Sequence, residues 1–506
     1  MGEDNRKEGK YTPLLRQCFV TASVAINIIG HGSIIGFPAI LIPSLRKPDS
    51  YIHATTAQES WIASIVGFAL IVGNFIITII LDNIGRKKSH LLTVFPVLLG
   101  WFMLLLVNNV AGLIVARFIQ GVAMGMLGPL GSIIIGEMTD PKNRGMFLTS
   151  VSLSLTIGVL FSHALGTYFT WQQSALICSF TTFTSLCLMI FTPESPSWLI
   201  TKGRYEEART VFFWLRGNSE EQQVELEKMI IAQKMSRKSS VADQKLSIQA
   251  RLKRYFKYIS EAGKKPEFFK PVIIMVFLYT MFQFAGINVI SSYAIDIIGH
   301  VVGPEANAKF LMVVLDIERL ICNLLAVYLM KTLKRRTLLF SSTFICIISY
   351  LGKAFYVYAK QKDILPYDSQ WIPISLIGLY MFSLTVGISS IPFAVSGELF
   401  PLEYRGLGGG VSYLALSLNF FVAVKCFPML TTAVGLSITY LLYTGMVVFC
   451  MTIVWFMLPE TKDKTLQEIE DSFRGFSPED AKSAEPLNGV NSGGEMMRRC
   501  SSHILY

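Results

Sequence analysis

Long hydrophobic segments alternate with short polar loops along most of this chain. Each segment has about 20 residues, which is the length that a helix needs to cross the hydrocarbon core of a bilayer. The pattern predicts membrane-spanning helices in two groups of six, separated by one long polar segment. The predicted spans are 17–43, 61–81, 90–108, 111–135, 147–169, 172–192, 270–291, 309–330, 337–358, 371–396, 407–430 and 433–458.

This pattern predicts an all-α membrane protein built from two pseudo-symmetric bundles of six helices. The expected regions are an N-terminal tail at 1–16, a bundle at 17–192, a helical linker at 193–269, a second bundle at 270–458 and a C-terminal tail at 459–506. Apolar residues at helical spacing between Arg204 and Leu215 predict an amphipathic helix in the linker. The polar tail is expected to be disordered after about residue 475.

The distribution of charge changes how the net charge of +10 is interpreted. A basic chain often binds nucleic acid, but here the basic residues gather in the loops after the second, sixth and eighth spans. Cytoplasmic loops of membrane proteins carry an excess of Lys and Arg, so these loops and both termini are expected in the cytoplasm. The expected surroundings are the lipid of the plasma membrane, with no nucleic acid. These basic loops are Arg86–Lys88, Lys202–Lys265 and Lys331–Arg336.

Chemistry typical of enzymes is not indicated. The eight cysteines have no spacing typical of a zinc site or a disulfide framework. No nucleophile with a nearby base and no phosphate-binding loop can be identified. We therefore expect no enzymatic activity, metal or cofactor, and the sequence does not indicate a protein partner.

Charged motifs occur twice, once in each half and in the same order. Two homologous halves in a membrane protein are typical of a transporter that moves one half against the other around a central site. The first copy is Asp82–Lys87, Glu137 seven residues before Arg144, and Pro193–Ser195. The second copy is Lys331–Arg336, Glu398 seven residues before Arg405, and Pro459–Thr461.

Taken together, these motifs resemble the sugar-porter branch of the major facilitator superfamily over about residues 17–470. Segments Glu59–Ala63 and Glu460–Glu470 look most like the insect facilitated trehalose transporter group. The resemblance implies facilitated diffusion of a sugar, trehalose or a hexose, by alternating access. The further motifs that carry it are Arg117 with Gly121 and Gly125, Pro193–Leu199, Gln283 with Gly286–Asn288, Glu398–Pro401 and Pro459–Lys462.

The resemblance also implies an inner gate, a set of ion pairs that closes the cytoplasmic end. Arginine and carboxylate groups form directional pairs, and pairs that form in one conformation only bias the conformational equilibrium. The alternative is that these charges only set the topology. Lys331 and Lys334 replace an acid and a glycine of the family pattern. The gate residues are Asp82, Arg86, Glu137, Arg144 and Glu194 in the first half, and Arg335, Arg336, Glu398, Arg405 and Glu460 in the second.

The substrate site implied by the resemblance keeps two amides, Gln283 and Asn288. Amides suit a sugar because its hydroxyls are recognised by hydrogen bonds. Other polar positions of the family are replaced, and each lost partner of a sugar hydroxyl costs about 1–3 kcal/mol. Phe282 and Ser152 stand where the family has glutamines, Phe393 replaces a tryptophan, and Arg319 replaces an asparagine.

The eighth span carries unusual charge. Asp316, Glu318 and Arg319 lie near its middle, where each charge costs roughly 2.5–3.5 kcal/mol. Asp316 and Arg319 could neutralise each other on one helix face, or the charges could form a substrate or ion site.

Proton-coupled members of the family carry an aspartate in the first span, whereas residues 17–43 here contain no acid. Facilitated diffusion is therefore expected, and the candidates for proton coupling are His31, Asp316 and Glu318. Two alternatives remain open: a porter of a polyol or of a charged metabolite held by Arg319, and a nutrient sensor that transports weakly.

Overall fold

The computed structural model describes residues 12–243, 257, 260–303, 306–365, 369–401, 404–462, 464 and 466–474. These residues form helices and connecting loops, with no strand among them. The tail beyond residue 474, which the sequence predicts to be disordered, lies outside this range.

The first half of the protein consists of seven helices. The opening span is broken at Phe37 and continues as a short second helix that begins at Pro38. The helices are α1 (Thr12–Gly36), α2 (Pro38–Leu45), α3 (Thr56–Ile84), α4 (Arg86–Leu106), α5 (Val110–Met138), α6 (Pro141–Tyr168) and α7 (Trp171–Phe191).

The second half repeats this arrangement with two interrupted spans. One is broken between Phe284 and Ile287, and the other contains a π-helical turn, η1. Its elements are α12 (Pro266–Phe284), α13 (Ile287–Val302), α14 (Ala308–Thr332), α15 (Arg335–Gln361), α16 (Trp371–Ser383), η1 (Leu384–Ile388), α17 (Ile391–Leu399), α18 (Arg405–Val434) and α19 (Leu436–Met457).

Eleven of the spans are long and apolar enough to cross a membrane. The twelfth, α14, is a helix of 25 residues. It is less apolar than the others because it contains Lys309, Asp316, Glu318, Arg319 and Lys331. The prediction of twelve spanning helices is confirmed, and α14 is the exceptional one.

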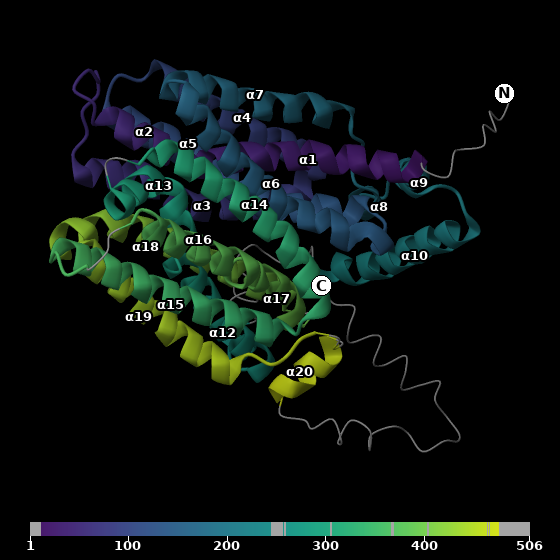
Figure 1. Ribbon diagram of the computed structural model, residues 1–506. Helices are drawn as coiled ribbons and strands as arrows, with labels where there is room; N and C mark the ends of the chain where they lie inside the picture. The colour runs from purple at the N-terminus through teal and green to yellow at the C-terminus, as the bar shows by residue number, and fades with distance from the viewer. Residues whose placement is uncertain are drawn as a thin grey trace.

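The two halves form separate stacks of helices, α1–α7 and α12–α19, that lie side by side (Figure 1). Within the first half, α5 approaches α3 closely at Gly121 and Gly125. A methyl group at Gly121 would lie 2.8 Å from the Cα atom of Val66 in α3. These glycines therefore allow backbone-to-backbone packing, as their spacing of four residues suggests.

The described residues of the linker and the tail form four helices at one end of the molecule. Helix α9 packs Ala208, Phe212 and Leu215 inward, which confirms the predicted amphipathic helix. Its last turn is attached to α1, because Arg16 and Gln17 donate to the carbonyls of Trp214 and Leu215 at 2.8 and 3.0 Å. The four helices are α8 (Pro196–Thr201), α9 (Tyr205–Arg216), α10 (Glu220–Asp243) and α20 (Leu466–Arg474).

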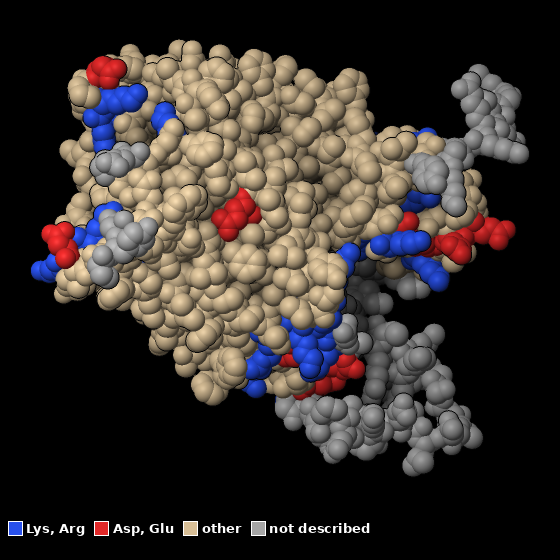
Figure 2. Space-filling model, in the orientation of Figure 1, with Lys and Arg blue, Asp and Glu red and all other residues tan. Residues whose placement is uncertain are grey.

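On the face of the molecule that Figure 2 shows, charged side chains lie mainly at the two ends, and the surface between them is almost entirely uncharged. We call the end that carries Arg86, Glu137, Arg335 and Glu398 the motif end, and the other the far end. A single acidic patch interrupts the uncharged surface over α14 in this view. Glu318 is the acid of α14 that is partly exposed, whereas Asp316 is buried.

Candidate functional site

In the first half, the charged motifs assemble around the start of α4. Arg86 forms a bidentate pair with Glu137, with nitrogen–oxygen distances of 2.8 and 2.9 Å. Glu194 accepts hydrogen bonds from the backbone N–H groups of Arg86 and Lys87 at 2.8 and 3.1 Å. It thereby caps a helix N-terminus, where the helix dipole favours negative charge. The hydroxyl of Ser195 donates to Glu137 and connects the two acids.

The second half builds the same arrangement from equivalent residues. Arg335 pairs with Glu398 at 3.3 Å, and Glu460 accepts from the backbone N–H groups of Arg335 and Arg336 at 3.0 and 3.1 Å. The hydroxyl of Thr461 donates to Glu398 at 2.5 Å. Each half therefore contains its own copy of the same network, which consists of an arginine, two glutamates and a hydroxyl.

The pKa of Glu460 reflects this environment. Burial acts to raise the pKa of its carboxyl, but four backbone N–H donors outweigh that effect and hold the pKa below its ordinary value. These donors belong to Lys462, Arg336, Arg335 and Thr461.

The remaining gate candidates are placed differently. Asp82 is largely exposed and lies 3.8 Å from Arg86. The side chain of Arg336 donates to the carbonyls of Leu458 and Trp455 at 2.6 and 2.9 Å, so it anchors the end of α19, and only the backbone N–H of Arg336 bonds to Glu460. The buried Nε atom of Arg144 has no hydrogen-bond partner in the described part of the chain. The backbone of Arg405 begins α18, and its side chain lies outside the described residues.

The far end, by contrast, contains bonds that join the two halves. Arg46, at the end of α2, pairs with Glu59 of its own half at 2.6 Å and with Asp296 of the second half at 2.9 Å. Lys425 of α18 donates to the hydroxyl of Ser60 at 2.8 Å and lies 4.0 Å from the ring centre of Trp61. Charge and cation–π contacts therefore hold the far end closed.

Side chains of α6 and α14 form further hydrogen bonds between the two halves, nearer the middle of the protein. His163 of α6 lies 2.5 Å from a carboxylate oxygen of Asp316 in α14, and both side chains are buried. Closer to the motif end, Asn323 donates to the hydroxyls of Ser152 and Thr156 at 3.1 and 3.0 Å.

No ion pair between the described residues joins the halves at the motif end, where each pair stays within its own half. The structure therefore represents the conformation in which the far end is closed and the motif-end pairs do not connect the halves.

The predicted amides flank the break between α12 and α13. Gln283 is buried, and its Oε1 accepts a hydrogen bond of 2.7 Å from Asn288. Between them, Gly286 has a φ of +88°, a conformation that strongly favours glycine. A side chain there would also lie 2.7 Å from the hydroxyl of Tyr380. The break brings two amides of one span into direct contact.

Two tyrosines satisfy the backbone at this break. Tyr350 and Tyr380 donate to the carbonyl of Ala285 at 2.9 and 2.6 Å. Lys353 is buried against the same rings, 3.3 Å from the ring centre of Tyr380 and 4.3 Å from that of Tyr350. A third ring, that of Tyr440, lies 4.8 Å from Lys353. Irregular backbone at membrane depth persists only where protein groups satisfy it, and this cluster supplies them.

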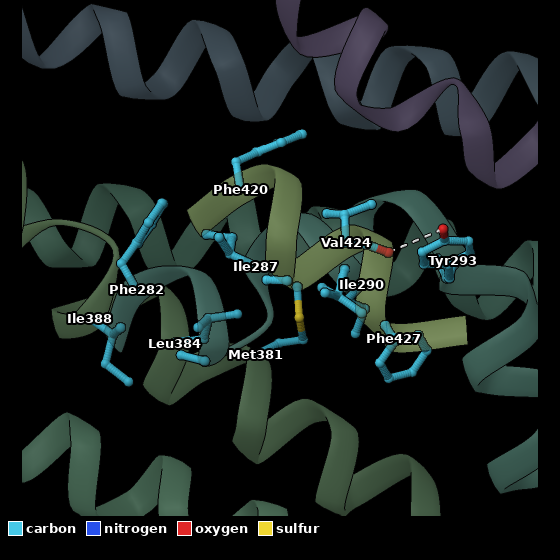
Figure 3. Packing of buried hydrophobic residues seen from close by; sticks show 14 of the residues in the cluster. Phe282, Ile287, Ile290, Tyr293, Met381, Leu384, Ile388, Phe420, Val424 and Phe427 are labelled. Atoms are coloured by element: carbon cyan, nitrogen blue, oxygen red, sulfur yellow. Dashed lines mark hydrogen bonds between the residues drawn. The ribbon is translucent and has the colours of Figure 1, made fainter. Parts of the chain in front are cut away.

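Apolar packing fixes the broken span from beneath. Figure 3 shows Leu384 and Met381 below the break, and the hydroxyl of Tyr293 bonded to the carbonyl of Val424 at 3.3 Å. The rings of Phe282 and Phe420 point instead toward the helices of the first half. The central face of the second half therefore presents aromatic rings beside the amide pair.

Phe282 and Phe393 lie together, with ring centres 5.6 Å apart in an edge-to-face arrangement. Phe393 also packs against Tyr279, yet 43% of its surface remains accessible. Ser152 is exposed on α6 and shares Asn323 with Thr156. Phe282 and Phe393 therefore supply an apolar platform, and Ser152 and Thr156 supply hydroxyl groups that contact Asn323 of the opposite half.

The charged residues of α14 do not behave as a simple pair. Arg319 is buried and donates to the hydroxyl of Ser291 at 2.9 Å. Asp316 bonds to His163, and no ion pair between Asp316 and Arg319, one of the two alternatives that the sequence offered, is found among the described residues. Glu318 faces outward near Gly378 of α16. His31 is buried, and its Nδ1 lies 2.8 Å from the carbonyl of Asn27.

Sequence reasoning missed His163, Thr156 and Asn323. One signal was available, because Asp316, Arg319 and Asn323 recur at intervals of three and four residues and so lie on one face of α14. That polar face indicates contact with another helix and not with lipid. Nothing in the sequence identified α6 as that helix.

Comparison with known proteins agrees with this geometry. The family "Sugar (and other) transporter" matches residues 17–473. The chain is 27% identical to the facilitated trehalose transporter Tret1 of Apis mellifera ligustica, covering 93% of this chain and 91% of that protein. It is also 27% identical to Tret1 of Bombyx mori, covering 92% and 90%.

Among solved structures, the inward open conformation of the xylose transporter XylE from E. coli has a TM-score of 0.68 at 18% identity. That likeness covers 90% of this chain and 99% of XylE, and it shows the twelve-helix fold. The family match covers most of the chain and both halves of the structure. This protein belongs to the sugar (and other) transporter family.

Proposed function

We propose that this protein moves a neutral sugar, trehalose or a hexose, across the plasma membrane by facilitated diffusion. The two halves rock against each other around a site in the middle of the membrane, and sugar binds there from whichever side is open. The protein carries out no chemical reaction, and its role is to lower the barrier to crossing.

The contact between Gln283 and Asn288 carries this proposal. Asn288 donates to Gln283 at 2.7 Å beside a break in the span, and the Nε2 of Gln283 donates to the carbonyl of Leu416 at 3.4 Å, so both amides are held in fixed positions. Paired amides can each donate and accept, which matches the hydroxyl groups of a sugar. The accessible ring of Phe393 offers an apolar face against which a sugar ring can pack.

A charged substrate is less consistent with these contacts. Arg319 would be its binding group, but the guanidinium donates to Ser291 and shares its helix face with Asp316. Moving the buried arginine away from Ser291 to bind an anion would cost this hydrogen bond, and the neighbouring acid would repel the anion. The site is therefore better suited to a neutral solute.

We assign the motif end to the cytoplasm. Its loops carry the basic clusters, including Arg86–Lys88 and Lys331–Arg336, and cytoplasmic loops hold such an excess. Both termini then lie in the cytoplasm, and the structure faces inward. The inner gate forms when the motif ends approach, so that Arg144, whose Nε has no hydrogen-bond partner here, and Arg405 can reach acids of the opposite half.

Uptake measurements test the proposal. Cells that express the full chain should take up labelled trehalose or glucose saturably, and they should not take up glucose 6-phosphate. Gln283→Ala should raise the half-saturating concentration. Binding of sugar without uptake, by protein shown to be at the cell surface, would contradict the proposal and favour a sensor.

A further inference from the structure

We propose that His163 and Asp316 form a proton-binding site that holds the far end closed, so that external pH regulates the conformational equilibrium. The pair joins α6 of the first half to α14 of the second, through His163 Nδ1 and a carboxylate oxygen 2.5 Å apart. This inference adds regulation to the proposed sugar transport and rests on that function for its biological meaning.

The hydrogen bonds around His163 determine how many protons the pair must hold. Its Nε2 lies 3.2 Å from the carbonyl of Gly36 in α1 and 3.1 Å from that of Ser291 in α13. Carbonyl oxygens only accept hydrogen bonds, so Nε2 must carry a hydrogen. The other nitrogen, Nδ1, faces the carboxylate, and a second hydrogen must lie between them.

That second hydrogen can reside on the imidazole or on the carboxyl, and in both cases the pair holds two hydrogens. A neutral histidine beside an ionised aspartate has one hydrogen too few for these contacts. If the single hydrogen is on Nε2, the lone pair of Nδ1 faces the lone pairs of the carboxylate. If it is on Nδ1, the lone pair of Nε2 faces those of two carbonyl oxygens. Since the side chains of His163 and Asp316 are only 1% and 7% exposed, water cannot relieve this repulsion.

Opening the far end would separate α6 from α14 and expose both groups to the external solution. In water an imidazole titrates near pH 6.5 and an aspartate carboxyl near pH 4, so above about pH 6.5 the separated groups have lost the extra proton. Closing the far end must then take up one proton from outside. Because the proton returns to the same side, no net proton transport is required.

Other ionisable side chains on the packed helices do not supply this hydrogen. Arg319 donates to Ser291, and Lys309 donates to the carbonyl of Gly166 at 3.1 Å. Lys353 lies among tyrosine rings that include Tyr380, and the hydroxyl of Tyr293 bonds to Val424. His31 on α1 is bonded to Asn27 of its own helix and so joins no second element through that bond.

The test measures the separation of the halves without any sugar. Phe169 and Ile364 are exposed at the far end, one in each half, and can be changed to cysteine for fluorescence energy transfer. The native cysteines that are not buried, Cys18, Cys187 and Cys426, are replaced by serine, and so is Cys500 of the tail. The full chain, reconstituted in vesicles, is then titrated from pH 5.5 to 8.5.

We expect the open fraction to rise relative to the closed fraction by up to tenfold per pH unit above about pH 6.5. His163→Ala should be open at the far end and insensitive to pH. Asp316→Asn should stay closed at every pH, because its amide N–H donates permanently to Nδ1. His300→Ala, at an exposed histidine of the far end, is the matched control and should keep the pH response.

A pH response that persists in His163→Ala would overturn the proposal. If that response also vanishes in His31→Asn, the proton-binding group is His31. A wild-type protein whose energy transfer does not change with pH would also overturn it and would leave the sugar assignment untouched. Conversely, a normal titration in a protein that transports neither trehalose nor glucose would refute the sugar assignment alone.

Discussion

Gly67 in α3 is the position at which a single methyl group should separate the two halves at the far end. The nearest atoms to a Cβ added there all belong to α18 of the second half. It would overlap the ring of Phe420 and lie 2.6 Å from the backbone nitrogen and 2.9 Å from the Cα of Phe421. A phenylalanine ring can rotate away, but the α18 backbone can move only if the halves part.

The expected size of the effect follows from this overlap. Non-bonded carbon atoms prefer about 3.5–4.0 Å, so α18 must move by roughly 1 Å. Inserting a methyl group into a packed interface costs about 1–3 kcal/mol. The cost vanishes when the far end opens, so Gly67→Ala should raise the ratio of open to closed molecules by roughly 5- to 150-fold.

Energy transfer between labels at Phe169→Cys and Ile364→Cys measures this ratio directly. Gly128→Ala is the matched control, because an added methyl there lies 3.6 Å from Tyr413 of α18, an ordinary contact across the same pair of halves. Unchanged energy transfer in Gly67→Ala, or an equal change in Gly128→Ala, would refute the argument that close approach of α3 and α18 closes the far end.

Four further substitutions test the site and the motif end. Gln283→Ala should raise the half-saturating concentration of trehalose in uptake assays by at least about fivefold, because Asn288 loses its partner. Ser152→Ala should change it less, because Asn323 keeps its bond to Thr156. Arg144→Ala should increase the fraction closed at the far end, since the Nε of Arg144 bonds to none of the described residues in this conformation; a decrease would contradict its role in the gate. Glu460→Gln should lower the free energy of unfolding at neutral pH by about 1–3 kcal/mol. Because the folded-state pKa of Glu460 is lowered, its contribution is present above the ordinary carboxyl value near 4.3 and is lost as the pH falls through the lowered value. Melting curves of the two proteins should therefore converge in strong acid, and a constant difference would refute this assignment.

Much of the fold could be predicted because membrane spans have a strong and local signal. Runs of apolar residues indicated all twelve helices, including α14 despite its charges. The duplicated motifs indicated the two halves. The arrangement of arginine, glutamate and hydroxyl around Arg86 and Arg335 was only partly anticipated, since the sequence placed the charges together but did not reveal that Glu194 and Glu460 bind backbone N–H groups.

The contacts between the halves could not be predicted, because they depend on how two bundles are placed in space. Spacing within α14 suggested that Asp316 and Arg319 pair, yet the carboxylate contacts a histidine 153 positions earlier. Lys353 reads as an isolated charge in an apolar span until three tyrosines from different helices are seen around it. Such long-range partners leave no periodic pattern in the sequence.

Counterflow in vesicles tests the central claim most directly. Purified protein is reconstituted in vesicles loaded with unlabelled trehalose or glucose, with no gradient of pH or voltage, and diluted into a trace of the labelled sugar. Facilitated diffusion by alternating access predicts a transient accumulation of label above its external concentration, and Gln283→Ala should reduce it. No accumulation of either sugar, with the protein shown to be folded and inserted, would contradict the account.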